Sequence, residues 1–223
     1  MELYTKTYRT GIILMAAGRS ERFGRNKLLE EFAGKPLVCH AMHLMRALSE
    51  APHKLAEGPC AAAEPHVVTC CREVEDLARS LHLPCTVYEG GEQSDTIRIG
   101  LSLPEAVSWD GCMFLPGDQP FLQAESVSKL LLAFAENPYE VHRLAYGTRI
   151  GSPVLFPAAF FSELRKLKGD TGGSSLIRRQ NIPVILCQAG SEKELLDADT
   201  AEEFELLLAM AGENQKKKNV RET

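Results

Sequence analysis

The sequence predicts a three-layer α/β/α fold of Rossmann-like type, in which helices cover both faces of a mostly parallel, mixed sheet. Three observations support this prediction. The apolar run at 12–15 precedes a small-residue loop, which is typical of a strand buried on both faces. Strand and helix patterns then alternate between 66 and 88. A second buried run at 112–115 ends just before an aspartate, and open α/β sheets bind ligands beyond the carboxyl ends of their strands.

Length and composition limit the possible classes of protein. With 223 residues, 44% of them hydrophobic, the chain can form the core of one α/β domain, which we expect to span 1–211. We expect the polar tail at 212–223 to be disordered. The formal net charge of −5 argues against a nucleic-acid partner, which would need a basic surface. Because no apolar run resembles a membrane span or a secretory signal, we expect a cytoplasmic protein with no membrane partner.

The loop after the first strand has the chemistry of a phosphate site. Small residues allow backbone N–H groups to approach phosphate oxygens, and cationic side chains neutralise the remaining charge. The candidate nucleotide-binding residues are Ala16, Ala17, Gly18, Arg19, Arg22 and Gly24, with Lys27 as a candidate catalytic cation. An ordinary strand-to-helix turn beside a solvated basic face is the alternative.

Two better-known phosphate loops are excluded. A Walker loop needs Lys and then Ser or Thr directly after its second glycine, whereas Arg25 and Asn26 follow Gly24. A dinucleotide fingerprint needs three closely spaced glycines, and the chain has none between Gly18 and Gly24. The loop therefore belongs to another kind of phosphate site.

The next part of the chain continues the alternation. Apolar spacing predicts helices at 36–48 and 73–81, with strands at 66–71 and 85–88. The segment 49–65 contains three prolines and indicates a long surface excursion. The stretch that begins at Gly90 is expected to start as a loop and to continue as a helix with Ser94 as its N-cap.

Asp118 lies just past the carboxyl end of the strand at 112–115. Gly117 before it and Pro120 after it indicate a tight, rigid turn. Such a turn can hold a carboxylate as a Mg²⁺ ligand, and a phosphate loop needs a cation to accompany it. A purely turn-forming aspartate is the alternative.

The last third of the chain completes the mixed sheet. The expected elements are a helix at 123–136, a rim pair of strands at 142–146 and 152–156, a helix at 160–167, a glycine-rich loop at 169–175 that contains Asp170, a helix from 176 and a strand at 183–187. A capping box of Thr200 and Glu203 then predicts the start of the last helix.

Several ordered motifs resemble one family. The run LMAAGRSERFGRNKLLEEFAGKPLVCHAM at 14–42 resembles the opening of the MobA-like nucleotidyltransferases, and LPGDQPFL at 115–122 resembles their central acidic motif. Within that family the chain is most similar to molybdenum cofactor cytidylyltransferases. Weaker matches run through GSPVLF, GDTGGSSL and LDADTAEEF, so that the resemblance covers about 11–208.

The resemblance implies a nucleotidyltransferase fold and particular site residues. The implied roles are catalysis by Lys27 and Asp118, Mg²⁺ binding by Asp118 and Asp199, nucleotide binding by Gln93 and Ser94 in addition to the first loop, and acceptor-side positions for Asp170 and Asp197. The family motif commonly has proline where Ala201 stands, a departure that leaves both carboxylates in place.

The resemblance also implies a reaction, in which a phosphate oxygen of metal-carrying molybdopterin attacks the α-phosphorus of CTP and pyrophosphate leaves. CTP is inferred because guanylyltransferase relatives usually have a second glycine at the position of Ala17. The expected partners are CTP or another NTP, a molybdopterin-type acceptor and a molybdenum hydroxylase apoenzyme. The alternatives are a sugar-phosphate or other small-molecule nucleotidyltransferase, or a non-catalytic molybdopterin- or nucleotide-binding maturation factor for a molybdenum hydroxylase.

Overall fold

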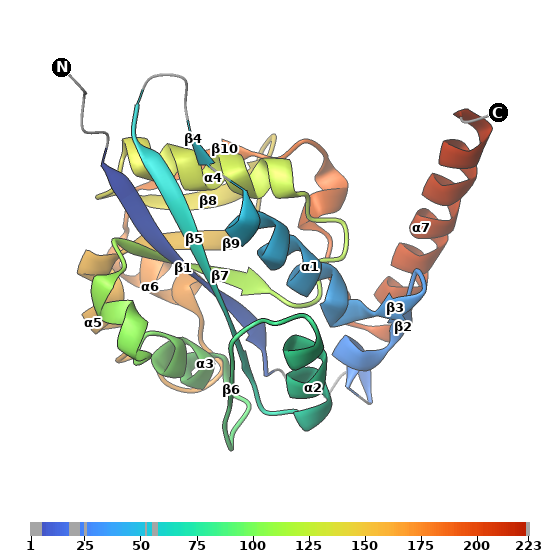
Figure 1. The fold of residues 1–223 in the computed structure, drawn as a ribbon, viewed down its shortest axis with the longest axis horizontal. Coiled ribbons are helices and arrows are strands. Elements are labelled where there is room, and N and C mark those ends of the chain that lie inside the picture. The colour runs from blue at the N-terminus through green and yellow to red at the C-terminus, as the bar shows by residue number, and fades with distance from the viewer. Residues whose placement is uncertain (1–5, 18–22, 25, 52, 55–57, 222–223) are drawn as a thin grey trace.

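One mixed, eight-stranded sheet forms the centre of the fold (Figure 1). The computed structural model describes residues 6–17, 23–24, 26–51, 53–54 and 58–221, with side chains as far as residue 212. The strands are β1 (Thr7–Ala16), β4 (His53–Lys54), β5 (Cys60–Thr69), β6 (Cys85–Val87), β7 (Gly111–Pro116), β8 (Val141–Tyr146), β9 (Arg149–Pro157) and β10 (Val184–Gln188). A separate small pair consists of β2 (Glu31–Phe32) and β3 (Lys35–Pro36).

The strands follow the order β10–β8–β9–β7–β1–β5–β4, and β6 pairs with β5. Strand β1 is parallel to β5 and β7, β6 is parallel to β5, and β10 is parallel to β8. Strand β9 runs antiparallel between β7 and β8, because β8 and β9 form a hairpin. This arrangement confirms the mostly parallel, mixed sheet.

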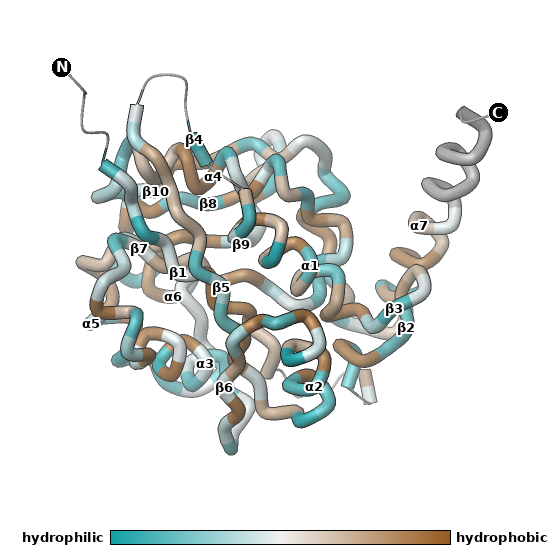
Figure 2. Tube along the Cα trace, in the orientation of Figure 1, coloured by the Kyte–Doolittle hydropathy of each residue, from teal (hydrophilic) through white to brown (hydrophobic). Residues whose placement is uncertain are grey.

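Helices cover both faces of the sheet. One core contains residues of α1 (Leu37–Glu50), α2 (Arg72–Ser80) and α4 (Ala124–Glu136), and the other contains residues of α3 (Gln93–Gly100), α5 (Phe161–Leu164) and α6 (Gly173–Gln180). Strand β1 contributes Ile12 and Leu14 to the first core and Ile13 to the second, since successive strand residues point to opposite faces. Figure 2 shows apolar segments along these central strands. The three-layer α/β/α prediction is therefore confirmed.

The structure corrects the expectation of a surface excursion at 49–65. Residues 60–65 are the first half of β5, which pairs with β1 from Thr7↔Cys60 to Ala16↔Thr69. Alanine has little preference for strands, so the sequence pattern misses this half. Pairing with the buried strand β1 overrides that weak local preference.

Helix α7 (Ala201–Arg221) closes the described chain and extends away from the sheet (Figure 1). The predicted capping box is present, because the Glu203 N–H donates to Thr200 Oγ1 at 3.2 Å and the Thr200 N–H donates to Glu203 Oε2 at 2.9 Å. The backbone is helical through Arg221, and the expected disorder of 212–223 stays a prediction. The Glu, Gln and Lys residues of this segment are good helix formers. The domain boundary at residue 211 stays a prediction.

No helix within the described ranges is long and apolar enough to cross a bilayer.

Candidate active site

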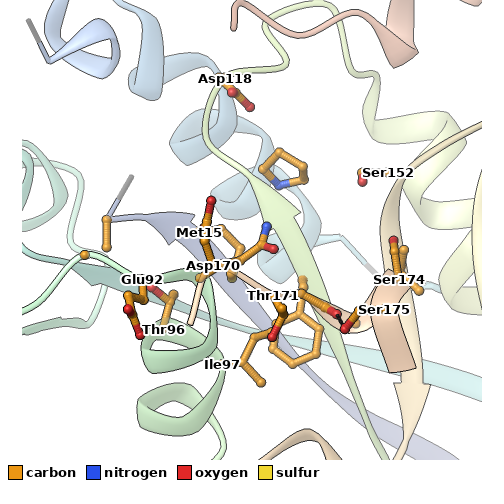
Figure 3. Close-up of a pocket in the computed structure, with 18 of the residues that line it drawn as sticks. Met15, Glu92, Thr96, Ile97, Asp118, Ser152, Asp170, Thr171, Ser174 and Ser175 are labelled. Atoms are coloured by element: carbon orange, nitrogen blue, oxygen red, sulfur yellow. Dashed lines mark hydrogen bonds between the residues drawn. The ribbon is translucent and has the colours of Figure 1, made fainter. Parts of the chain in front are cut away.

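A cavity of about 390 Å³ lies at the carboxyl ends of β1 and β7 (Figure 3). The end of β1 contributes Met15 and Ala17 to its wall, and the turn after β7 contributes Asp118. The remaining walls come from the start of α3, from β9, and from the loop at 169–175 with the first turn of α6. The cavity is therefore where open α/β sheets bind their ligands.

Lys27 joins two carboxylates from distant parts of the chain. Its Nζ lies 2.6 Å from Asp118 Oδ2 and 3.0 Å from Asp199 Oδ1. The Lys27 side chain is only 12% exposed, whereas that of Asp199 is 39% exposed. The structure thus brings together three of the residues proposed for catalysis and metal binding.

Local packing fixes the position of Lys27. The 3₁₀ turn η2 (Lys27–Leu29) begins after Asn26, whose side-chain oxygen accepts from the Leu28 N–H at 3.2 Å. Leu28 is buried against the turn that contains Gly117. A Cβ at Gly117 would lie 3.3 Å from Leu28 Cδ2 and 3.3 Å from the Met15 carbonyl oxygen, which is a tight contact. A glycine there lets the Lys27 turn and the Asp118 turn approach each other closely.

Asp199 is positioned by the apolar cluster that packs around the neighbouring residue Ala198. The neighbouring Ala198 is fully buried with Phe32 and Phe204, which join β2 to α7. Edge-to-face contact of Phe32 and Phe204, with ring centroids 6.0 Å apart, ties the start of α7 to the segment that follows Lys27. The carboxylates on either side of Ala198 are therefore anchored by a packed side chain.

The electrostatics of this cluster follow from its charges. Burial alone would lower the pKa of Lys27, but the Asp118 and Asp199 carboxylates outweigh it and raise that pKa. Partial desolvation raises the pKa of Asp197, and repulsion from Asp118 and Asp199 raises it further. The ammonium of Lys27 is thus firmly charged, and an additional negative charge at Asp197 is opposed.

Asp118 and Asp199 are the residues that could hold a metal ion. No group of three or more His, Cys, Asp or Glu side chains in the described part of the chain is placed to do so. Two carboxylates nevertheless fit a hard divalent cation such as Mg²⁺, which usually takes one or two carboxylates and completes its shell with phosphates and water. The donor set therefore suits a cation that arrives with a nucleotide.

The first loop is anchored to the end of β5. The carbonyl of Ala16 accepts from Thr69 Oγ1 at 2.8 Å, and the carbonyl of Ala17 accepts from Cys70 Sγ at 3.3 Å. Sequence reasoning missed both donors, for which the only signal was their place at a strand end. Gly24 has a φ of +78°, a conformation that favours glycine. Gly18, Arg19 and Arg22 lie outside the described residues.

The two candidates on α3 have different positions. Gln93 lines the cavity, and a Cβ at Gly172 would overlap its side-chain amide. Ser94 is buried away from the cavity wall, and its N–H donates to the Gly169 carbonyl at 3.3 Å. Glu92 occupies the N-cap position of α3, so the expectation that Ser94 is the N-cap is wrong. Ser94 ties the helix to the loop at 169–175.

The two acceptor-side candidates also lie in different places relative to the cavity. Asp170 lines the cavity, whereas Asp197 lies near Asp118 and Asp199 and is not part of the wall. Helix α6 begins at Gly173, earlier than the expected start at 176. Its first turn therefore adds Ser174 and Ser175 to the wall, and sequence reasoning had named neither residue.

Comparisons with known proteins agree with this architecture. PucB of Bacillus subtilis (strain 168), a purine catabolism protein, is 28% identical over 202 residues, which cover 87% of this chain and 94% of PucB. The crystal structure of Rv0371c from Mycobacterium tuberculosis H37Rv superposes with a TM-score of 0.69 and 22% identity over 92% of this chain and 99% of that one. Its complex with manganese gives a TM-score of 0.66 and 21% identity over 91% and 98%.

A nucleotide-bound structure shares the fold as well. CMP-2-keto-3-deoxy-manno-octonic acid synthetase complexed with CTP superposes with a TM-score of 0.67 and 14% identity over 94% of this chain and 100% of that one. The family model described as the MobA-like NTP transferase domain matches residues 12–184. This chain therefore belongs to the MobA-like NTP transferase family and is a nucleotidyltransferase.

Proposed function

We propose that this protein transfers CMP from CTP to molybdopterin that carries its metal, and releases pyrophosphate. The main support is the cluster of Lys27, Asp118 and Asp199 beside the cavity. A buried ammonium and two carboxylates are the groups needed to bind a triphosphate together with a divalent cation. The resemblance of the sequence motifs to cytidylyltransferases supports the finer assignment.

The transfer needs little covalent chemistry from the protein. A phosphate oxygen of the acceptor attacks the α-phosphorus of CTP, and the bond to the β-phosphate oxygen breaks as pyrophosphate leaves. Lys27 exchanges its carboxylate partners for the outer phosphates and neutralises the charge that grows on the leaving group. Asp118 and Asp199 would hold Mg²⁺, which when bound neutralises phosphate charge.

Base selection is proposed to involve Ala17. This residue is buried and lines the cavity, and Gln93 at the start of α3 lines the same cavity. A methyl group in that position narrows the space that a glycine would leave. The preference for CTP over GTP rests on this difference.

We also propose that the protein has a molybdenum hydroxylase as its partner. PucB is named as a purine catabolism protein, which is compatible with delivery of the finished cofactor to a molybdenum hydroxylase. We also propose a cytoplasmic location.

The test is release of pyrophosphate by the purified chain. Pyrophosphate should appear with CTP and molybdenum cofactor, and not with CTP and a panel of sugar phosphates. Asp118→Asn, which keeps the shape of the side chain and removes its charge, is the matched inactive control. Turnover with a sugar phosphate would favour the alternative nucleotidyltransferase function. Tight CTP and cofactor binding without pyrophosphate release would favour a maturation factor.

A further inference from the structure

Two arginines outside the set of nucleotide candidates lie in or near the cavity wall. Arg178, on α6, lines the cavity. Ser174 lies on the same helix, and Figure 3 shows Ser152 and Ser174 across the cavity from Glu92 and Thr96 at the start of α3. This end of the cavity therefore has its own polar groups, apart from the Lys27 cluster.

Arg143, on β8, approaches the same end. It pairs directly with Val154 of β9, so the two side chains project from the same face of the sheet, and Val154 lines the cavity. The half-buried guanidinium donates from Nε to the Gly151 carbonyl at 2.5 Å. Because Ser152 follows Gly151 and also lines the cavity, Arg143 lies at the cavity edge.

The two guanidinium groups interact without a neutralising carboxylate. Burial lowers the pKa of Arg143, and repulsion from Arg178 lowers it further. Neither arginine forms an ion pair with a carboxylate of the described residues. Asp170 and Glu92 also line the cavity, yet neither is paired with these cations. An anion that enters this end of the cavity would therefore meet two guanidinium groups that have no carboxylate partner among the described residues.

We infer that Arg143 and Arg178, with the hydroxyls of Ser152 and Ser174, bind a phosphate monoester of the acceptor. Guanidinium groups bind phosphate oxygens in pairs of parallel hydrogen bonds, and hydroxyl groups can donate to the remaining oxygens. The inference rests on the proposed function in one respect, that the second substrate brings the phosphate. The triphosphate of the nucleotide is the other source of phosphate oxygens that the two arginines could bind.

Inorganic phosphate is the probe, titrated by calorimetry into the full chain already saturated with CTP. Since CTP then fills the nucleotide side, added phosphate reports the arginine end. We expect Arg178→Ala to weaken phosphate binding roughly 10- to 100-fold, as for loss of a charged hydrogen-bonding partner, and Arg178→Lys to restore part of it. Arg179→Ala is the matched control, because Arg179 is exposed on the same helix, as Arg178 is, but does not line the cavity. It should change phosphate affinity less than twofold.

The outcomes separate the two sources of phosphate. If Arg178→Ala and Arg143→Gln weaken CTP binding and leave phosphate binding unchanged, the arginines serve the nucleotide and the inference is wrong. Equal phosphate affinity in all variants, or no phosphate binding by the CTP-saturated protein, also overturns it. If CTP itself does not bind, the proposed function fails, and titration of the nucleotide-free protein still tests the arginine site.

Discussion

The cationic side chains at the two ends of the cavity differ in whether they have carboxylate partners. Lys27 is enclosed by the carboxylates of Asp118 and Asp199, whereas Arg178 and Arg143 have no carboxylate partner among the described residues. Among the described residues, the first end places two carboxylates around one ammonium, and the second end has two guanidinium groups without a carboxylate partner. This difference supports the two proposals made above, that the first end receives a cation with its phosphates and that the second end receives an anion alone.

The largest expected effect comes from Asp118→Ala. Removing this carboxylate should lower transfer about 100- to 1,000-fold, as when a preorganised transition-state interaction is lost. The fold should be retained, because Asp118 follows β7 and is not part of a core. Pyrophosphate release at saturating Mg²⁺ measures the effect, and Asp76→Ala on the exposed face of α2 is the control. Near-normal turnover of Asp118→Ala would show that the carboxylate end does not bind the cation.

Lys27→Ala should have the next largest effect. Loss of the ammonium should weaken CTP binding about 10- to 100-fold and weaken CMP binding much less, since the outer phosphates are its proposed partners. Calorimetry with CTP and CMP measures the difference, with Lys35→Ala on β3 as the control. Equal losses for the two nucleotides would place the outer phosphates elsewhere in the cavity.

Local patterns predicted the carboxylate end better than the arginine end. The buried run of β7 followed by a tight turn made Asp118 a candidate, and the cationic loop did the same for Lys27. Asp199 entered only through the family resemblance, since a capping box explained its segment equally well. Lys27 and Asp118 thus stood in recognisable local patterns, and Asp199 did not.

Arg143 and Arg178 stood in no such pattern. A strand arginine and a helix arginine influence each other only through the tertiary fold, because β8 and α6 are separated by β9 and α5 along the chain. The alanine-rich half of β5 was missed for the same reason, because its pairing with β1 is tertiary. Sequence patterns thus identified elements with strong local preferences and missed contacts made between elements.

Ala17→Gly tests base selection at the nucleotide end. One methyl group contributes about 1–3 kcal/mol of discrimination between two substrates. Ala17 is one of several residues that line the cavity, so we expect the lower part of this range, which is about a tenfold gain in the use of GTP relative to CTP. Competition between CTP and GTP in the wild type and the variant measures it. A wild type that already prefers GTP would contradict the cytidylyl proposal, whereas an unchanged preference in the variant would move the determinant toward Gln93.

The smallest expected effect concerns the raised pKa of Asp197 beside Asp118 and Asp199. Partial desolvation and the carboxylates of Asp118 and Asp199 raise the pKa of Asp197, so the folded protein binds this proton more tightly than the unfolded chain does. The resulting stabilisation is complete below the unfolded pKa of about 3.9 and is lost as the pH rises through the higher folded pKa. At pH 7 the ionised carboxylate therefore destabilises the fold, although its partial exposure to solvent keeps the effect small.

Asp197→Asn removes that charge while keeping the shape of the side chain. The free energy of unfolding should rise at pH 7 relative to the wild type, and the difference should shrink toward zero below about pH 4. Urea denaturation across this range, without divalent cations and at constant salt, measures both quantities, with the exposed Asp76→Asn as the control. Because divalent cations neutralise the same carboxylates, adding Mg²⁺ should reduce the advantage of the variant at pH 7. A variant less stable than the wild type at pH 7 would mean that favourable contacts of Asp197 outweigh its repulsion by Asp118 and Asp199, and this contrast with the arginine end would be lost.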